Sequence, residues 1–187
     1  MPRPLRTKSG FAGETMIIRQ ETPQDYDAVY KMVKASFATA SCSDGTEADY
    51  LNNLRTKEYF VPELSLLAVE NNITVGQIVL YRTPIQLPDK TLTELVISPL
   101  SVHPDYFRRG IATALVNAGI TQAQKMGYKA AFLCGEPAFY QKLGFVATYN
   151  YGIYHVKDKL AAWCMVKELA SGFLNAFSGT VSTVNIE

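Results

Sequence analysis

Apolar residues recur along this chain with two different spacings, one typical of helices and the other of strands. Over residues 22–37 they lie three or four positions apart, which predicts a helix with one buried face. Thr22 and Pro23 open this stretch as a capping residue followed by a proline, which is a common helix start. A short strand is predicted before this helix at residues 16–20, and a second helix is predicted to begin at Thr46.

The spacing changes to that of strands in the middle of the chain. Residues 64–70 and 73–81 form two β-rich runs, and the Asn71-Asn72 pair between them predicts a two-residue hairpin turn. Residues 83–90 contain two prolines and are predicted to be a connection.

A long apolar strand is predicted at residues 91–102, and Ser98 and Pro99 interrupt it. Because proline has no amide hydrogen to donate, Pro99 predicts an edge, a bulge or a separation of strands at this point. The order of all the elements predicts one mixed α/β layer fold. The remaining predicted elements are a helix at residues 109–126, a strand at 130–134, a short helix at 138–143, a strand from Phe145 and a last strand at 162–169.

The composition is that of a globular protein. Apolar residues make up 48% of the 187 residues and charged residues 19%, which predicts one folded domain at residues 16–187. Residues 1–15 lack the apolar core of a secretion signal and are predicted to be a flexible arm or a remnant of expression. No apolar run approaches the ~20 residues that a membrane span needs, so no membrane association is expected.

Charge and cysteine content narrow the function classes. Eighteen Lys and Arg residues stand against 17 Asp and Glu residues, and a formal charge of +1 argues against a nucleic-acid partner. The cysteines, Cys42, Cys134 and Cys164, are scattered and odd in number. A disulfide framework is therefore not expected, and a reducing, cytoplasmic location is predicted. With two histidines in the chain, a metal site is not expected either.

Residues 100–115 carry the strongest chemical signal. A strand ends at Val102, a turn follows, and a helix begins near Gly110, so unpaired amides and the positive end of a helix dipole are directed at one spot. Gly110 and Ala112 have almost no side chain, and Arg108 and Arg109 add positive charge, which suits a pyrophosphate. The alternative is an ordinary strand–turn–helix with two solvated arginines. The segment contains neither a P-loop nor the GxGxxG dinucleotide motif.

Two further features identify a family. Residues 139–145 read Phe-Tyr-Gln-Lys-Leu-Gly-Phe, and Pro99 splits the strand that leads into the turn. Together with the turn, they resemble the GNAT superfamily of acyl-CoA-dependent N-acetyltransferases, and most closely its YhbS-type branch. The resemblance covers about residues 16–169. It implies the GNAT fold, a central, mixed and mostly antiparallel twisted sheet that is splayed at a bulge and flanked by helices on both faces.

The chain departs from the family pattern at one position. The family turn has the form (Q/R)xxGx(G/A), and Phe107 stands where the family has Gln or Arg. The amide contacts of such a turn need no side chain, so phosphate binding is expected to survive. Arg108 is the candidate to replace the missing side-chain contribution.

The resemblance implies acetyl-CoA as the co-substrate and assigns residues to it. The main chain of Leu100, Ser101 and Val102 would hold the pantetheine arm, and an N–H of this strand would stabilise the oxyanion. Tyr140 would contact the donor and protonate the leaving thiolate after direct attack in a ternary complex. The residues implied to bind the pyrophosphate are Phe107, Arg108, Arg109, Gly110, Ile111, Ala112 and Thr113.

Each candidate side chain has a structural alternative. Tyr140 could simply pack a short helix against the sheet. Glu136 is a candidate base for the acceptor amine, or an acid that stabilises a helix start, and the second role is favoured. Cys134 could form an acyl-enzyme, but buried strand cysteines are usually inert. His103 is expected to be a turn residue, and Glu94 lies either on the acceptor side or on a surface strand.

The acceptor is expected to be a primary amine of a small molecule or peptide. Its pocket is predicted from the loop at residues 38–46, the second helix and the aromatic segment at residues 149–155, which could instead be core or the face of a homodimer. The alternative functions are acetylation of a protein N-terminus or lysine, and an acyl-CoA-binding or regulatory module without turnover. The presence of Tyr140 favours an active enzyme.

Overall fold

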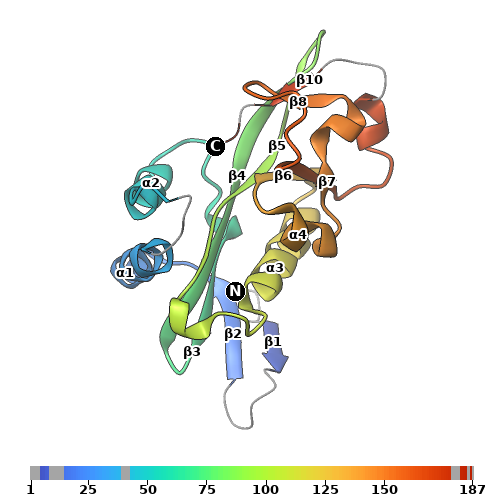
Figure 1. Cartoon of the computed structure of the whole chain (residues 1–187). Helices are drawn as coiled ribbons and strands as arrows, with labels where there is room; N and C mark the ends of the chain where they lie inside the picture. Colours follow the sequence, from blue (N-terminus) through green and yellow to red (C-terminus); the bar gives the residue numbers. More distant parts are fainter. Residues whose placement is uncertain (1–4, 9–14, 39–42, 178–181, 185, 187) are drawn as a thin grey trace. The chain divides into compact units, whose positions relative to one another are not determined.

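The computed structural model describes residues 5–8, 15–38, 43–177, 182–184 and 186 (Figure 1). The chain divides into two compact units, which are described separately below. The first unit comprises residues 1–79 and 99–119, and the second comprises residues 80–98 and 120–187. Cys42 and the tip of the loop expected beside the acceptor lie outside the described residues. The single domain expected at residues 16–187 stays a prediction.

The first unit contains an antiparallel sheet with the strand order β1-β2-β3-β4. Strand β1 (Leu5–Lys8) lies within the segment expected to be a flexible arm, and it pairs with β2 (Thr15–Gln20). Strand β2 pairs with β3 (Ser65–Glu70), and β3 forms a hairpin with β4 (Ile73–Gln86). Asn71 and Asn72 both adopt the left-handed conformation, with φ of 50° and 63°. The predicted hairpin turn is confirmed, because a type I′ turn requires positive φ at both central residues.

Two helices follow β2 in the first unit. Helix α1 (Tyr26–Phe37) begins after a short 3-10 turn at Pro23–Asp25 that is closed by a capping box of Thr22 and Asp25, as predicted from the start signal. Helix α2 is Glu47–Leu54, and a 3-10 turn at Pro62–Leu64 leads into β3. Each helix buries one apolar face. The buried side chains are Val29, Met32 and Val33 in α1, and Ala48, Leu51 and Leu54 in α2.

Helices cover both faces of this sheet, as expected. A Cβ atom built on Gly76 of β4 would lie 3.0 Å from side-chain atoms of both Ile111 and Leu115 in α3 (Ile111–Lys125). The next residue, Gln77, faces the opposite side because strand residues alternate. Its side chain accepts a hydrogen bond from Ser101, whose hydroxyl also lies 3.9 Å from the sulfur of Met32 in α1. Helices α1 and α3 therefore pack on opposite faces of β4 (Figure 1).

The second unit contains the rest of β4, the first part of β5 (Thr91–Val102) and several shorter strands. Strand β6 (Ala130–Cys134) is parallel to β5 and antiparallel to β9 (Cys164–Glu168), which also pairs with β7 (Val146–Ala147). Strand β10 (Ser182–Val184) is parallel to β8 (Ile153–His155) and antiparallel to the end of β4. The predicted mixed, mostly antiparallel α/β fold is confirmed.

The short helical segments of the second unit close its core. They are α4 (Pro137–Tyr140) and 3-10 turns at Gln141–Leu143, Thr148–Tyr151 and Leu174–Phe177. Phe132, Phe145 and Phe177 are among the largest fully buried side chains. Among the described residues, no helix is both long and apolar enough to span a membrane.

The first half of one predicted connection belongs to a strand, whereas its second half, residues 87–90, is a turn closed by a hydrogen bond from the Leu87 amide to the Lys90 carbonyl over 2.8 Å. Residues 83–90 were expected to be a loop, yet β4 continues through Pro84 to Gln86. Thr83 and Ile85 are buried whereas Pro84 and Gln86 are exposed, which is the alternation of a strand. Strand β10 pairs with Ile85 and Gln86, so a segment about one hundred positions later in the chain extends β4. That pairing is not visible in the local sequence.

Candidate active site

Strands β5 and β6 separate just before the proline that predicted a disruption. They are paired at two positions, the last of which joins Val96 to Phe132, whereas β6 pairs with β9 along all five of its residues. Pairing therefore ends two residues before Ser98 in the described structure. The expected separation of strands is present, but β5 itself runs through Pro99 without a break. The register shift recorded for the first unit lies in β3 instead, between Ala68 and Val69.

Successive residues at the end of β5 direct their main-chain N–H and C=O groups to opposite edges of the strand. The His103 amide donates to the Val75 carbonyl of β4 over 2.9 Å, and the Ser101 carbonyl lies 3.2 Å from the position of a Cβ on Gly76. Because successive residues of a strand direct their N–H and C=O groups to opposite edges, those of Leu100 and Val102 point away from β4. These two residues can therefore present main-chain groups to a ligand. The main chain of Ser101, which was expected to do the same, faces β4.

The turn after β5 is made of tight local structure. His103 caps a 3-10 turn at Pro104–Tyr106, and its ring Nδ1 accepts a hydrogen bond from the Asp105 amide over 3.3 Å. Its expected role as a turn residue is confirmed. Arg108 and Gly110 both have positive φ, of 62° and 78°. Glycine adopts this conformation readily, but for arginine it is strained, and such strain is concentrated at functional sites.

Helix α3 begins directly after this turn. The first recorded bond of the helix runs from the Ala114 amide to the Gly110 carbonyl, over 3.0 Å. The amides of Ile111, Ala112 and Thr113 precede this bond, so they have no partner within the helix. Together with the left-handed residues before them, they place N–H donors at the positive end of the helix dipole, an arrangement that favours anions. The Phe107 amide instead donates to the Pro104 carbonyl over 3.1 Å, so Phe107 does not offer a free amide.

The two arginines of the turn have different surroundings. The Arg109 guanidinium donates to the buried carboxylate of Glu70 over 2.9 Å and lies 5.0 Å from the ring centre of Tyr106. Arg108 is exposed, and among the described residues no carboxylate lies within ion-pair distance of it. The charge of Arg109 is therefore already balanced, and Arg108 offers the uncompensated charge. Phe107, at the family's Gln or Arg position, is 49% exposed.

Tyr140 lies at the end of α4 in the second unit and is held by aromatic contacts. Its ring makes edge-to-face contacts with Phe139 and Phe145, with centroid distances of 4.8 and 5.6 Å. A Cβ atom on Gly135 would overlap the ring, which packs directly on the glycine. Burial raises the pKa of Tyr140 from 10 to about 12, so the phenol carries its proton at neutral pH. This combination suits a proton donor.

Gly135 is a contributor that the sequence reasoning did not single out. Several described glycines that lie in turns have positive φ, but Gly135 is not among them. The glycine is therefore needed for space and not for backbone conformation. Its place directly before Glu136 and Pro137, at the step from β6 to α4, is the sequence signal that could have identified it.

The two glutamates considered as site residues have structural contacts. The Glu136 side chain accepts a hydrogen bond from the Ala138 amide over 3.2 Å and so caps α4, which is the favoured alternative given above. Glu94 is buried and accepts hydrogen bonds from the amides of Lys129 and Ala130, over 2.9 and 3.2 Å. Burial raises its pKa. Glu94 therefore secures the start of β6 and does not lie on the surface.

Cys134 and His155, the last residue of the aromatic segment, both contact the carbonyl oxygen of Ile186. A Cβ atom built on Gly135 would point at the Tyr140 ring and would lie 3.3 Å from a side-chain atom of Leu133. Leu133 and Gly135 therefore face the same side of the chain, and the intervening Cys134 faces the opposite side of β6. Its thiol lies 3.5 Å from the Ile186 carbonyl oxygen. His155 is buried, its Nε2 lies 3.0 Å from the same oxygen, and its ring contacts Trp163. The orientation of Cys134 argues against an acyl-enzyme.

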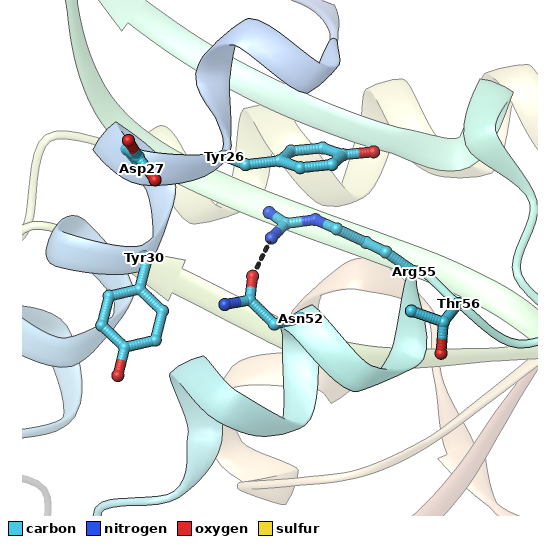
Figure 2. A pocket seen from close by; sticks show the side chains of 6 residues that line it. All are labelled: Tyr26, Asp27, Tyr30, Asn52, Arg55 and Thr56. Carbon is cyan, nitrogen blue, oxygen red and sulfur yellow. Dashed lines mark hydrogen bonds between the residues drawn. The ribbon is translucent and has the colours of Figure 1, made fainter.

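A separate groove lies between α1 and α2 of the first unit and has a volume of about 420 Å³ (Figure 2). Figure 2 shows the Arg55 guanidinium stacked on the Tyr26 ring, at 4.0 Å, and bonded to Asn52. Arg55 also forms an ion pair with the buried Glu21, which accepts a hydrogen bond from Ser65. The charge of Arg55 is therefore balanced by Glu21 within the first unit. The groove is lined by Tyr26, Asp27, Tyr30, Asn52, Arg55 and Thr56.

The sequence of this chain is similar to those of known N-acetyltransferases. The sequence model of the acetyltransferase (GNAT) domain matches residues 17–147. The uncharacterised N-acetyltransferase YhbS of Escherichia coli strain K12 is 27% identical over 168 residues, which cover 89% of this chain and 95% of YhbS.

Within the described residues, no group of three or more His, Cys, Asp or Glu side chains could hold a metal ion.

Solved structures show the same fold. A crystal structure of Escherichia coli YhbS in complex with CoA has a TM-score of 0.76 and 23% identity, covering 92% of this chain and 89% of YhbS. A GNAT family acetyltransferase from Brucella melitensis in complex with acetyl-CoA has a TM-score of 0.63 and 27% identity, covering 71% and 83% of the two chains.

The mixed sheet with its separating strands, and the turn with left-handed residues before α3, accord with the match to the acetyltransferase (GNAT) domain. The chain belongs to the acetyltransferase (GNAT) domain family. It is an acetyl-CoA-dependent N-acetyltransferase, and the family expected from the sequence is confirmed.

Proposed function

We propose that this enzyme transfers the acetyl group of acetyl-CoA to a primary amine of a small molecule or peptide, by direct attack within a ternary complex. The observation that carries the donor half of this proposal is the turn before α3, where two left-handed residues precede the unpaired amides of a helix N-terminus. YhbS with bound CoA and the Brucella melitensis enzyme with bound acetyl-CoA support the same donor.

In the proposed complex, the amides from Arg108 to Thr113 bind the pyrophosphate, whereas the Phe107 amide stays bonded to the Pro104 carbonyl of the preceding turn. The exposed guanidinium of Arg108 adds a charge to this contact, while Arg109 stays paired with Glu70. The outward-facing main-chain groups of Leu100 and Val102 pair with the amides of the pantetheine arm. An N–H of this strand also donates to the thioester carbonyl and stabilises the oxyanion as it develops.

The proposed chemical step needs one nucleophile and one acid. The neutral amine nitrogen attacks the thioester carbonyl carbon, a C–N bond forms, and the C–S bond then breaks. Tyr140 donates its proton to the departing CoA thiolate, the amine loses its extra proton to solvent, and the Tyr140 phenolate regains a proton from solvent. General acids contribute about 10²–10⁴-fold. Burial makes Tyr140 a weaker acid than a free phenol. Its expected contribution to the rate therefore lies near the lower end of this range, at about a hundredfold.

Glu136 is left out of the proposed proton transfers because its carboxylate caps α4. Positioning donor and acceptor together supplies much of the acceleration in a direct transfer. A dedicated base is therefore not required when the amine arrives in its neutral form.

Two measurements test the proposal. Acetyl-CoA should raise the melting temperature, whereas NAD and ATP should not, and equal shifts from all three would refute a specific donor site. Release of thiol from acetyl-CoA is then measured with panels of small amines, amino acids and peptides. Amine-dependent release with stoichiometric N-acetyl product is expected. Release that no amine accelerates would contradict the proposed acceptor class.

A further inference from the structure

Two cysteines lie directly opposite each other on neighbouring strands of the second unit. Cys134 ends β6, and its partner in the antiparallel register is Cys164, the first residue of β9. The adjacent pair is joined by a hydrogen bond from the Gly135 amide to the Trp163 carbonyl, over 2.9 Å. Hydrogen-bonded and non-hydrogen-bonded pairs alternate in such a ladder, so the two cysteines form a non-hydrogen-bonded pair.

This register brings the thiols within bonding range. In a non-hydrogen-bonded pair the Cα atoms are about 4.5 Å apart and the side chains lie on the same face. Disulfides accept Cα separations of about 4.4–6.8 Å. Both cysteines are reduced in the structure. Little backbone movement is therefore needed to join them.

The two thiols differ in exposure and in acidity. Cys134 is partly exposed, whereas Cys164 is fully buried. A hydrogen bond from Cys134 lowers the pKa of Cys164, burial opposes this effect, and a hydrogen bond with Thr148 adds to it. An oxidant can therefore reach Cys134 first, and the adjacent Cys164 has the enhanced thiolate character of a resolving nucleophile.

We propose that Cys134 and Cys164 form an oxidative modification site at which hydrogen peroxide converts the two thiols into one disulfide. The sulfur of Cys134 attacks the peroxide, an S–O bond forms, the O–O bond breaks, and the first water leaves. The sulfur of Cys164 then attacks the sulfenic acid, an S–S bond forms, the S–O bond breaks, and the second water leaves. Two thiols and one peroxide thus give one disulfide and two waters, with both electrons going to the peroxide.

The experiment uses the full chain, which provides Cys42 as an internal control. Protein reduced with dithiothreitol is freed of reductant, treated with hydrogen peroxide, denatured, blocked with N-ethylmaleimide and digested without reduction. Mass spectrometry is expected to find a peptide that joins Cys134 to Cys164, one maleimide per chain at Cys42, and an intact mass lower by two hydrogens before blocking. Dithiothreitol is expected to reverse all three changes.

Single variants separate the role of Cys134, which the peroxide oxidises first, from that of Cys164, which then forms the disulfide. Cys42→Ser is expected to keep the cross-link. Cys164→Ser is expected to stop at the sulfenic acid of Cys134, which dimedone traps. The proposal is overturned if the cross-link involves Cys42 or two chains. It is equally overturned if, in the unchanged protein, Cys164 stays reactive toward maleimide after denaturation while Cys134 is unmodified or has advanced to a sulfinic or sulfonic acid.

Discussion

The turn before α3 and the segment around Tyr140 both contribute to the proposed reaction, but they are built from different parts of the polypeptide. In the turn, the proposed binding groups are main-chain amides, and the side chains of Phe107 and Arg108 are exposed. Around Tyr140, the acting group is one side chain, and its position depends on packing against Gly135, Phe139 and Phe145.

This difference teaches where each region is sensitive to substitution. The turn should tolerate changes of side chain unless the new group fills the space above the amides or repels the pyrophosphate proposed to bind there. The Tyr140 segment should respond to a single added methyl group, because one ring position decides whether the hydroxyl reaches the thiolate.

The largest effect is expected for Ala112→Glu in the turn. A carboxylate beside the pyrophosphate adds like-charge repulsion of several kcal/mol, so affinity for acetyl-CoA should fall by about a thousandfold. An acidic residue near a helix N-terminus is compatible with the dipole, so the donor-free protein should stay folded. Isothermal titration checks the affinity. Ala112→Gln is the control of similar size, and an equal loss in both variants would assign the effect to bulk instead of charge.

Tyr140→Phe removes the hydroxyl and keeps the ring. Turnover should fall by about a hundredfold while the Kd of acetyl-CoA changes little, because the aromatic packing survives. Single-turnover kinetics at saturating donor measure the chemical step. An unchanged rate with chemistry limiting would show that Tyr140 only packs α4. In the unchanged enzyme, a pKa of about 12 predicts no loss of rate from deprotonation of Tyr140 up to about pH 10.

Gly135→Ala tests the packing around the acid directly. The added Cβ would overlap the Tyr140 ring, so the ring should move and turnover should fall by about tenfold. Gly127→Ala is the matched control, since Gly127 has φ of 86° and open space around its Cβ position. That variant should lose stability and keep its rate.

A double variant separates mispositioning from a general loss of structure. When Tyr140 is already phenylalanine, adding Gly135→Ala should lower the melting temperature further but leave the residual rate unchanged, because no hydroxyl remains to misplace. A further tenfold loss of rate in the double variant would contradict the positioning role. If Tyr140→Phe itself has no effect, the acid assignment fails instead.

Local sequence signals were sufficient for most elements of this fold. The spacing of apolar residues predicted α1 and α3, Asn71-Asn72 predicted the hairpin, and Pro99 predicted the separation of β5 from β6. Each of these signals lies within the element that it describes. The turn was predictable for the same reason, because small residues and a helix start are adjacent in the chain.

Features that depend on distant partners were not predictable in this way. The end of β4, at Ile85 and Gln86, pairs with β10 from the far end of the chain. Glu70, which holds Arg109, lies 39 positions earlier in the chain. The direction of the Ser101 main chain depends on its register with β4, and no local pattern specifies that register. The sequence could therefore place the two arginines in the turn, but it could not distinguish their roles.

That distinction between neighbouring arginines gives the smallest expected effect. Arg108→Ala should weaken acetyl-CoA binding by about two- to fivefold, the range of an exposed ion pair, and leave the melting temperature of the donor-free protein unchanged. The difference should shrink at high salt, because exposed charges are screened. Arg109→Ala should instead reduce the free energy of unfolding by about 1–3 kcal/mol, because the buried Glu70 carboxylate loses its partner. Titration calorimetry and chemical denaturation of both variants measure the two effects. If Arg109→Ala weakened binding without loss of stability, its guanidinium would have to leave Glu70 for the phosphate, and the turn would depend on side chains more than its backbone geometry implies.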